Sequence, residues 1–292
     1  MKSLKTLYIV LIFVITAIII AVVLGFRFSH IKNNLSGINI FTSSDLKTES
    51  GKLSAFNDID IEGDVISFTV KEGEDYSYEF NYPEELSPEI YVKDDCLYIK
   101  VKAEKAINLK LVDGVHVDET FKLTVYVPEG TNFGKLTANV DAGEIKLDGY
   151  EFDSMDVDAD AANVGLMNII SGRTDIKADA GNVIIKKSST GDIAVSTDAG
   201  NVEFTDVKSG DVNVETDLGN IEFSEVSFDC GDFTSSMGNI EIDGEFNEVT
   251  ADCSLGVIDI DTPNENAKID AEVELGSISV NGKKIHGKKF DN

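Results

Sequence analysis

One pattern of about nineteen residues recurs eight times between Leu136 and Val280. Neighbouring copies read Thr-Asp-Ala-Gly-Asn-Val-Glu-Phe from Thr197, Thr-Asp-Leu-Gly-Asn-Ile-Glu-Phe from Thr216 and Ser-Ser-Met-Gly-Asn-Ile-Glu-Ile from Ser235. A constant period near twenty residues, with strand-like alternation and no helical spacing, indicates a solenoid in which each repeat is one coil. We take the glycine of each copy as its marker; the markers, spaced by 19, 19, 19, 19, 19, 18 and 20 residues, are Gly143, Ala162, Gly181, Gly200, Gly219, Gly238, Gly256 and Gly276.

Apolar residues keep fixed positions relative to the marker and alternate with polar ones at period two. Such alternation is typical of strands with one buried face, and β-branched residues favour strands. Five and three positions before the marker, the residues between Ala138 and Val273 are apolar or small and are predicted to face inward. Two and four positions after it, the predicted inward columns are Ile145, Val164, Val183, Val202, Ile221, Ile240, Ile258 and Ile278, and Leu147, Leu166, Ile185, Phe204, Phe223, Ile242, Ile260 and Val280.

The marker separates two strands of each coil. A tight corner there often needs φ > 0, which glycine adopts without steric cost, so we expect left-handed glycines at the corners and a slightly different corner at Ala162. Proline is absent between Lys135 and Thr262, as expected where every strand donates backbone N–H groups to the next coil. The predicted fold is all-β: a single-stranded right-handed β-solenoid (β-helix), with its handedness taken from the usual preference.

An uncharged apolar segment precedes the repeats. Leu7–Phe26 contains twenty residues, and a helix of that length spans about 30 Å, the thickness of a bilayer core. We predict a transmembrane helix over residues 7–26. The alternative is a cleaved signal peptide, whose apolar region usually has about 7 to 15 residues and ends at a small-residue cleavage site.

The orientation of that helix is weakly determined by charge, because Lys2 and Lys5 precede it while Arg27 and Lys32 follow it. A short cytoplasmic tail with the bulk of the chain outside is the ordinary arrangement of a signal anchor. We therefore predict a single-pass cell-membrane protein with a cytoplasmic tail over residues 1–6 and its solenoid outside the cytoplasm. The polar residues 27–55 are predicted to form a stalk, with an edge strand at Ile38–Phe41 as the alternative.

Residues 56–130 alternate like strands but lack the nineteen-residue period. We predict that they form a degenerate, β-rich N-terminal cap and early coils that cover the open edge of the regular repeats, which occupy residues 131–282. A separate β-sandwich is the weaker alternative. Alternating residues mark the expected strands, from Ile59 and Ile61 to Val125 and Val127.

The sequence Leu-Thr-Val-Tyr-Val-Pro-Glu-Gly at Leu123–Gly130, followed by repeated Asp-Ala-Gly-Asn-Val units, resembles the putative-adhesin β-strand-repeat family, also called the toastrack domain. The resemblance covers roughly Phe56 to Val280, and the preceding apolar segment is similar to that of LiaG-like proteins of Gram-positive bacteria. It implies a β-solenoid outside the membrane, associated with cell-envelope stress systems, and it brings no catalytic residues to this chain.

A column of acidic residues lies two positions before the marker, and asparagines lie one position after it from Asn163 to Asn239. Carboxylate and amide oxygens are ligands of calcium, so a calcium-binding, adhesin-like surface module is one hypothesis. The favoured interpretation is turn chemistry, with Asp side chains accepting backbone N–H groups and stacked Asn side chains bonding along the column. No cofactor is predicted, and the calcium candidates are Asp141, Asp160, Asp179, Asp198 and Asp217.

The charge, the spacing of the carboxylates and the number of cysteines argue against several classes of function. A formal net charge of −28 with only two arginines, Arg27 and Arg173, excludes nucleic acid as a partner. A polysaccharide-active β-helix enzyme needs carboxylates gathered at one place, whereas these belong to repeating columns. Three cysteines provide neither a metal pattern nor an even disulfide set: Cys96, Cys230 and Cys253.

We therefore predict a non-enzymatic protein, held in the membrane by its own helix, that presents an acidic solenoid for binding or assembly with an unidentified envelope component or membrane protein. Residues 283–292 form a basic C-terminal tail with four lysines. Lysines beside a terminal strand commonly prevent edge pairing, and docking on an anionic lipid or wall polymer is the functional alternative.

Overall fold

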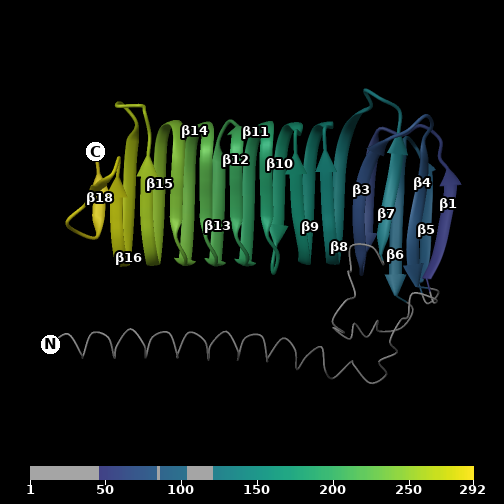
Figure 1. Ribbon diagram of the computed structural model, residues 1–292, viewed down its shortest axis with the longest axis horizontal. Coiled ribbons are helices and arrows are strands. Elements are labelled where there is room, and N and C mark those ends of the chain that lie inside the picture. The colour runs from purple at the N-terminus through teal and green to yellow at the C-terminus, as the bar shows by residue number, and fades with distance from the viewer. Residues whose placement is uncertain (1–45, 84–85, 104–120) are drawn as a thin grey trace, which may run out of the picture. The chain divides into compact units, whose positions relative to one another are not determined.

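The computed structural model describes residues 46–83, 86–103 and 121–292 (Figure 1). All regular elements in these ranges are strands, which confirms the all-β prediction, and they hold no helix that is long and apolar enough to cross a membrane. The predicted transmembrane helix over residues 7–26, the cytoplasmic tail and most of the predicted stalk lie outside the described residues.

The repeats stack as parallel coils along one row (Figure 1). Leu136 pairs with Met155, and the nineteen-residue offset continues through Val183 with Val202 and Val202 with Ile221. This in-register stacking confirms the solenoid. Its strands are β8 (Asn132–Asp148), β9 (Glu151–Met167), β10 (Ile170–Ala178), β11 (Val183–Ala199), β12 (Val202–Lys208), β13 (Val212–Leu218), β14 (Ile221–Met237), β15 (Ile240–Asp261) and β16 (Lys268–Val280).

The four predicted inward columns are buried in every coil. The largest exposure among them is 7 %, at Val280 in the last coil, and the eight residues two positions after the marker are at most 1 % exposed. Stacked rings reinforce the core, because the centroids of Phe204 and Phe223 lie 4.2 Å apart on adjacent coils. No coil has enough interior to bury these side chains alone, so the stability of each coil depends on its neighbours.

The predicted reason for the marker glycines is wrong for all but one of them. Among the marker glycines, only Gly143 has a positive φ, at 132°. At Gly200 a Cβ would lie less than 3.0 Å from the carbonyl oxygen of Gly181 in the preceding coil, and the same approach recurs from Gly181 to Gly276. Glycine is required because successive backbones nearly touch at this corner. Ala162, 1 % exposed, pairs in register with Gly143, and the unusual φ of this pair lies at Gly143 and not at Ala162.

A second corner lies six positions after the marker and has left-handed φ in five successive coils. Its residues share no side-chain type, so the sequence did not indicate it. The next coil lacks this residue, because Phe223 pairs with Ile242 whereas Val226 pairs with Gly244. The lost residue accounts for the one spacing of 18 residues between markers, from Gly238 to Gly256. The left-handed residues are Gly149, Asn168, Lys187, Asp206 and Glu225, with φ between 50° and 81°.

Glu225→Gly is expected to stabilise the protein. Holding a residue other than glycine in the left-handed region costs about 1 to 2 kcal/mol, and substitution by glycine removes this strain. Glycine also raises the entropy of the unfolded chain, which cancels about 0.4 to 1 kcal/mol of that gain in stability. We expect a net gain near 1 kcal/mol, measured as a higher urea midpoint. Asn168→Gly is the matched control and should gain less, because asparagine tolerates this conformation. A loss of stability in Glu225→Gly would contradict this account of the corner.

The N-terminal strands extend the stack, but not in sequence order. β2 (Asp58–Gly63) and β3 (Ile66–Glu72) pair in parallel with β8 on one side and with β6 (Cys96–Ala103) and β7 (Lys122–Val127) on the other. Between them in sequence, β4 (Ser77–Pro83) and β5 (Leu86–Lys93) run antiparallel to β7 and β6. These reversals explain why residues 56–130 show no nineteen-residue period.

One segment of the predicted stalk is a strand. β1 (Leu46–Lys52) pairs antiparallel with β4. Tyr78 and Tyr82 donate hydroxyl hydrogen bonds of 2.8 and 2.6 Å to the two carboxylate oxygens of Glu49. These bonds hold the pKa of Glu49 below its usual value, and burial with the Glu49 contact raises the pKa of both tyrosines to about 12. The polar composition that suggested a stalk therefore includes a carboxylate fixed within the sheet.

The predicted basic tail folds back onto the last coil. β17 (Lys283–Lys284) and β18 (Lys289–Asp291) pair antiparallel with β16, and Lys289 forms a 3.0 Å ion pair with Asp270. The backbone N–H of Ile269 donates to Asn292. These short, lysine-bearing strands cover two parts of the terminal edge, as expected for a guard against edge pairing.

Candidate functional site

The asparagine column forms a continuous hydrogen-bonded ladder. The side-chain oxygen of Asn201 accepts a 2.9 Å hydrogen bond from the backbone N–H of Asn220, one coil further on. The same bond links Asn163 to Asn182 and ends at Asn239, which accepts from Val257. The predicted bonding along this column is therefore present, with a backbone donor. These amides stabilise the corner, which leaves less of their hydrogen-bonding capacity for a ligand.

Asn201→Ala is expected to cost about 1 kcal/mol, because it leaves the backbone N–H of Asn220 without its protein acceptor at a partly exposed corner. Asn201→Asp keeps an acceptor oxygen in place and should cost less. Chemical unfolding of both variants measures the difference. Equal losses in the two variants would mean that the ladder bond contributes nothing to stability.

Inside the same corner, small polar side chains satisfy the marker carbonyls. Thr216 and Ser235 donate to the carbonyl oxygens of Gly200 and Gly219 at 3.4 Å. The Cys253 thiol takes the equivalent place, 3.3 Å from the carbonyl oxygen of Gly238, and burial raises its pKa. All three cysteines are free. Cys253 thus continues a column of buried hydroxyl groups and is poorly placed for reaction with solvent.

The five predicted calcium candidates lie on successive coils at the outer side of the marker corner. Asp179 is 3.2 Å from Lys177, and Asp217 accepts a 3.3 Å hydrogen bond from Ser236. Partial burial, then the charges of Asp64 and Asp160, raise the pKa of Asp141. No group of three or more His, Cys, Asp or Glu side chains in the described ranges has the arrangement of a metal site. Calcium binding stays a prediction, tested by a calcium-dependent rise in melting temperature.

The raised pKa of Asp141 predicts a small pH-dependent penalty. The folded chain binds this proton more tightly than the unfolded chain, so ionised Asp141 opposes folding at neutral pH, and the penalty disappears as pH falls towards the ordinary pKa of 3.8. Asp141→Asn is therefore expected to raise the melting temperature at pH 7 by less than about 2 °C, because the site is largely exposed. The gain should vanish near pH 4, and a larger gain at pH 4 than at pH 7 would contradict this assignment.

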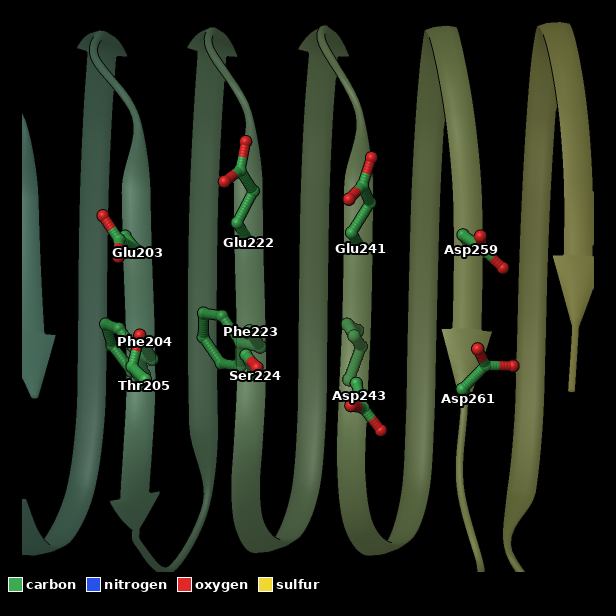
Figure 2. Close-up of a pocket in the computed structure, with 11 residues that line it drawn as sticks. Glu203, Phe204, Thr205, Glu222, Phe223, Ser224, Glu241, Asp243, Asp259 and Asp261 are labelled. Atoms are coloured by element: carbon green, nitrogen blue, oxygen red, sulfur yellow. The ribbon is translucent and has the colours of Figure 1, made fainter. Parts of the chain in front are cut away.

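Outside the marker corner, carboxylates line a shallow groove across strands β12, β14 and β15 (Figure 2). Glu203, Glu222 and Glu241 are register partners on successive coils. The described part of the chain supplies one ion pair here, between Lys186 and Glu203 at 2.6 Å. The groove carboxylates are Glu203, Glu222, Glu241, Asp243, Asp259 and Asp261, with Thr205 and Ser224 between them.

Sequence reasoning missed this groove, although its residues recur three and five positions after the marker. The signal was weak because the same positions hold Lys146, Gly165 and Ile184 in earlier coils. The acidic groove is thus confined to the later coils. One carboxylate oxygen of Asp259 is buried without a hydrogen-bond partner in the described structure. The groove favours positively charged groups, and its carboxylates repeat without one distinct acid–base pair.

A second shallow groove lies over the strands that carry the positions before the marker, between β10 and β15. Arg173 forms a bidentate ion pair with Asp175, with contacts of 2.6 and 2.9 Å, so this arginine has the partner that the sequence did not reveal. Asp192, Asp211 and Asp232 lie on the following coils, and exposed Cys230 is among them. Desolvation, followed by the charges of neighbouring acidic groups, raises the pKa of the Cys230 thiol, which makes it a poor nucleophile.

Parallel coils with a glycine corner, an asparagine ladder and acidic outer faces define an all-β solenoid built from repeats. The chain belongs to the Toastrack DUF4097 family, whose model matches residues 56–288. None of the curated proteins compared with the chain matches it.

The chain also resembles solved structures. The chain is similar to a putative adhesin from Parabacteroides distasonis, with 16 % identity, 80 % of this chain and 95 % of that chain covered and a TM-score of 0.50. It is also similar to a putative adhesin from Bacteroides fragilis, with 17 % identity, 83 % and 100 % covered and a TM-score of 0.47. At these identities the likeness concerns the fold.

Proposed function

We propose that this protein is a non-enzymatic binding module of the bacterial cell envelope. In this proposal residues 7–26 anchor it in the membrane, the solenoid stands outside the cytoplasm, and its acidic outer faces bind or assemble an envelope partner as part of the response to envelope stress. The observation that carries the proposal is the repetition of acidic groups on successive coils, among which the described residues form no distinct catalytic constellation.

Two features support binding over catalysis. The groove carboxylates lie in open columns, where water screens them and where no side chain is singled out as general acid or base. The fold relatives are described as putative adhesins, which agrees with a binding role. A surface with this charge gains from positively charged or amphipathic partners through long-range attraction, and salt should weaken the interaction.

Crosslinking of the full-length chain in its native membrane, followed by identification of the attached molecule, tests the proposal. The matched variants are Glu222→Gln with Glu241→Gln in the groove and Asp156→Asn with Asp158→Asn on the other face. Recovery of an envelope component that the groove variant loses supports the module. Turnover of a polysaccharide that one Asp or Glu substitution abolishes would establish an enzyme instead.

A protease-protection experiment on intact cells tests the orientation. External protease should reach the solenoid only after the wall is removed, and a fusion reporter that requires the exterior should be active at the C-terminus. Activity of a cytoplasmic reporter at that end would contradict the membrane topology while leaving the binding role open.

A further inference from the structure

An apolar ridge follows the marker corner of the last four coils. The residue directly before the marker is alanine in the first four coils, from Ala142 to Ala199. In the later coils it is a large apolar residue, and these four side chains are register partners on successive coils. We call them the corner ridge: Leu218, Met237, Leu255 and Leu275.

The fold does not need large side chains at these positions. Leu275 is 59 % exposed, the highest exposure among the large apolar residues of the described ranges, and the other three are half-buried. Val257 beside the ridge is 37 % exposed. Because alanine at the same place supports the stacking of the earlier coils, the ridge is surplus to folding and points to an interaction surface.

The polar surroundings change together with the ridge. The acidic column beside it changes to Ser236 and Ser254 in the middle of the ridge, while Asp217 and Glu274 remain at its ends. On the other side Asn220 donates a 3.3 Å hydrogen bond to Glu222, which places the acidic groove next to this corner. The ridge is therefore an apolar strip with a neutral centre and acidic borders.

We propose that the corner ridge binds a basic amphipathic helix of a partner polypeptide. Apolar side chains of the helix cover the ridge, and its lysines or arginines meet the acidic borders. A second copy of this chain fits poorly, because each carries a formal net charge of −28 and the rods would repel. Four side chains in single file also fall short of the roughly 800 Å² per partner that stable interfaces between folded proteins bury.

The spacing of the ridge selects a helix. Successive coils are about 4.8 Å apart, so the four side chains extend over about 14 Å along the stack. A helix presents the same face about every 5.4 Å. Over the length of the ridge, its side chains therefore shift by only about 2 Å relative to the ridge side chains. An extended strand presents the same face about every 6.8 Å, so its side chains shift by about 6 Å relative to the ridge side chains over the same length. A partner helix of about ten residues suffices to cover the ridge.

The test uses full-length protein and a synthetic 18-residue peptide of leucine and lysine arranged with helical periodicity, followed by fluorescence anisotropy. Its control is a peptide of the same composition in an order that has no helical face. The ridge variant is Leu255→Ala with Leu275→Ala, which installs the residue of the earlier coils. The control variant is Ile170→Ala, which removes an apolar side chain that is 54 % exposed outside the ridge.

We expect the periodic peptide to bind with a dissociation constant at least about tenfold lower than the scrambled one, and the ridge variant to lose about tenfold in affinity while Ile170→Ala binds normally. Equal binding of both peptides would mean that charge alone attracts them and would overturn the proposal. So would unchanged affinity in the ridge variant, dimerisation through the ridge in sedimentation, or ridge-dependent binding to neutral phosphatidylcholine vesicles in place of the peptide. The envelope-binding function is tested separately, because the ridge variant leaves every groove carboxylate in place: an envelope component that the ridge variant still binds supports the proposed function whatever the peptide does.

Discussion

Replacing Gly200 with alanine is expected to destabilise the solenoid by more than about 4 kcal/mol, or to prevent its assembly. The new Cβ would lie less than 3.0 Å from the carbonyl oxygen and carbon of Gly181, and neither backbone atom can turn aside as a side-chain end could. Relief requires the coils to separate, which also breaks the ladder bonds between Asn182, Asn201 and Asn220. Urea unfolding followed by circular dichroism measures the loss.

Gly165→Ala is the matched control, because the nearest atom to a Cβ there is 4.0 Å away and its φ is not in the left-handed region. This variant should stay within about 0.5 kcal/mol of the original chain. A similar small effect at Gly200 would show that the coils are farther apart than this structure has them.

Phe223→Ala is expected to cost about 3 to 5 kcal/mol. Its side chain is 3 % exposed, stacks on Phe204 with centroids 4.2 Å apart, and meets the ring of Phe233 edge-on at 5.1 Å. Removing the ring leaves a cavity between two coils that cannot close without bending both strands. We expect the melting temperature to fall by about 8 to 15 °C in a domain of this size.

Ile184→Ala serves as its control, because Ile184 lies on the outer face with 36 % exposure and should cost less than about 1 kcal/mol. Thermal unfolding of the two variants gives the comparison. If both lose the same stability, the ring column is not the interior of the coils.

The regular part of the fold could be predicted from the sequence because its period and its side-chain alternation are local properties. The inward columns around Val202 and Phe204 needed only the recurrence of apolar residues at fixed distances from the marker. The purpose of the marker glycine could not be predicted in this way. Both a left-handed corner and a close approach of backbones require glycine, and only the stacking of Gly200 over Gly181 distinguishes them.

The left-handed corner escaped prediction because residues as different as Lys187 and Glu225 occupy it. Neighbouring contacts impose the backbone conformation there, so no residue preference records it. The N-terminal strands were predicted as strands, but their spatial order depends on the antiparallel turns of β4 and β5, which the alternation of side chains does not encode.

For the surfaces, the asparagine column was visible in the sequence and its bonding was predicted in outline. The acidic groove and the corner ridge were missed because both appear only in the later coils, where columns change residue type. The residues that the repeats share build the scaffold, whereas these two surfaces depend on how Leu218 and Glu222 differ from their equivalents in earlier coils.

Stacked coils enclose one interior, and inward and outward side chains alternate along each strand. Single cysteines at Val183, Ile184, Val202 and Glu203, introduced into a chain whose own cysteines are replaced by serine, test it directly through their rates of maleimide labelling. We predict fast labelling at positions 184 and 203 and protection at 183 and 202 until denaturant unfolds the coils. Equal rates at all four positions, or protection at 184 and 203 instead, would contradict the account.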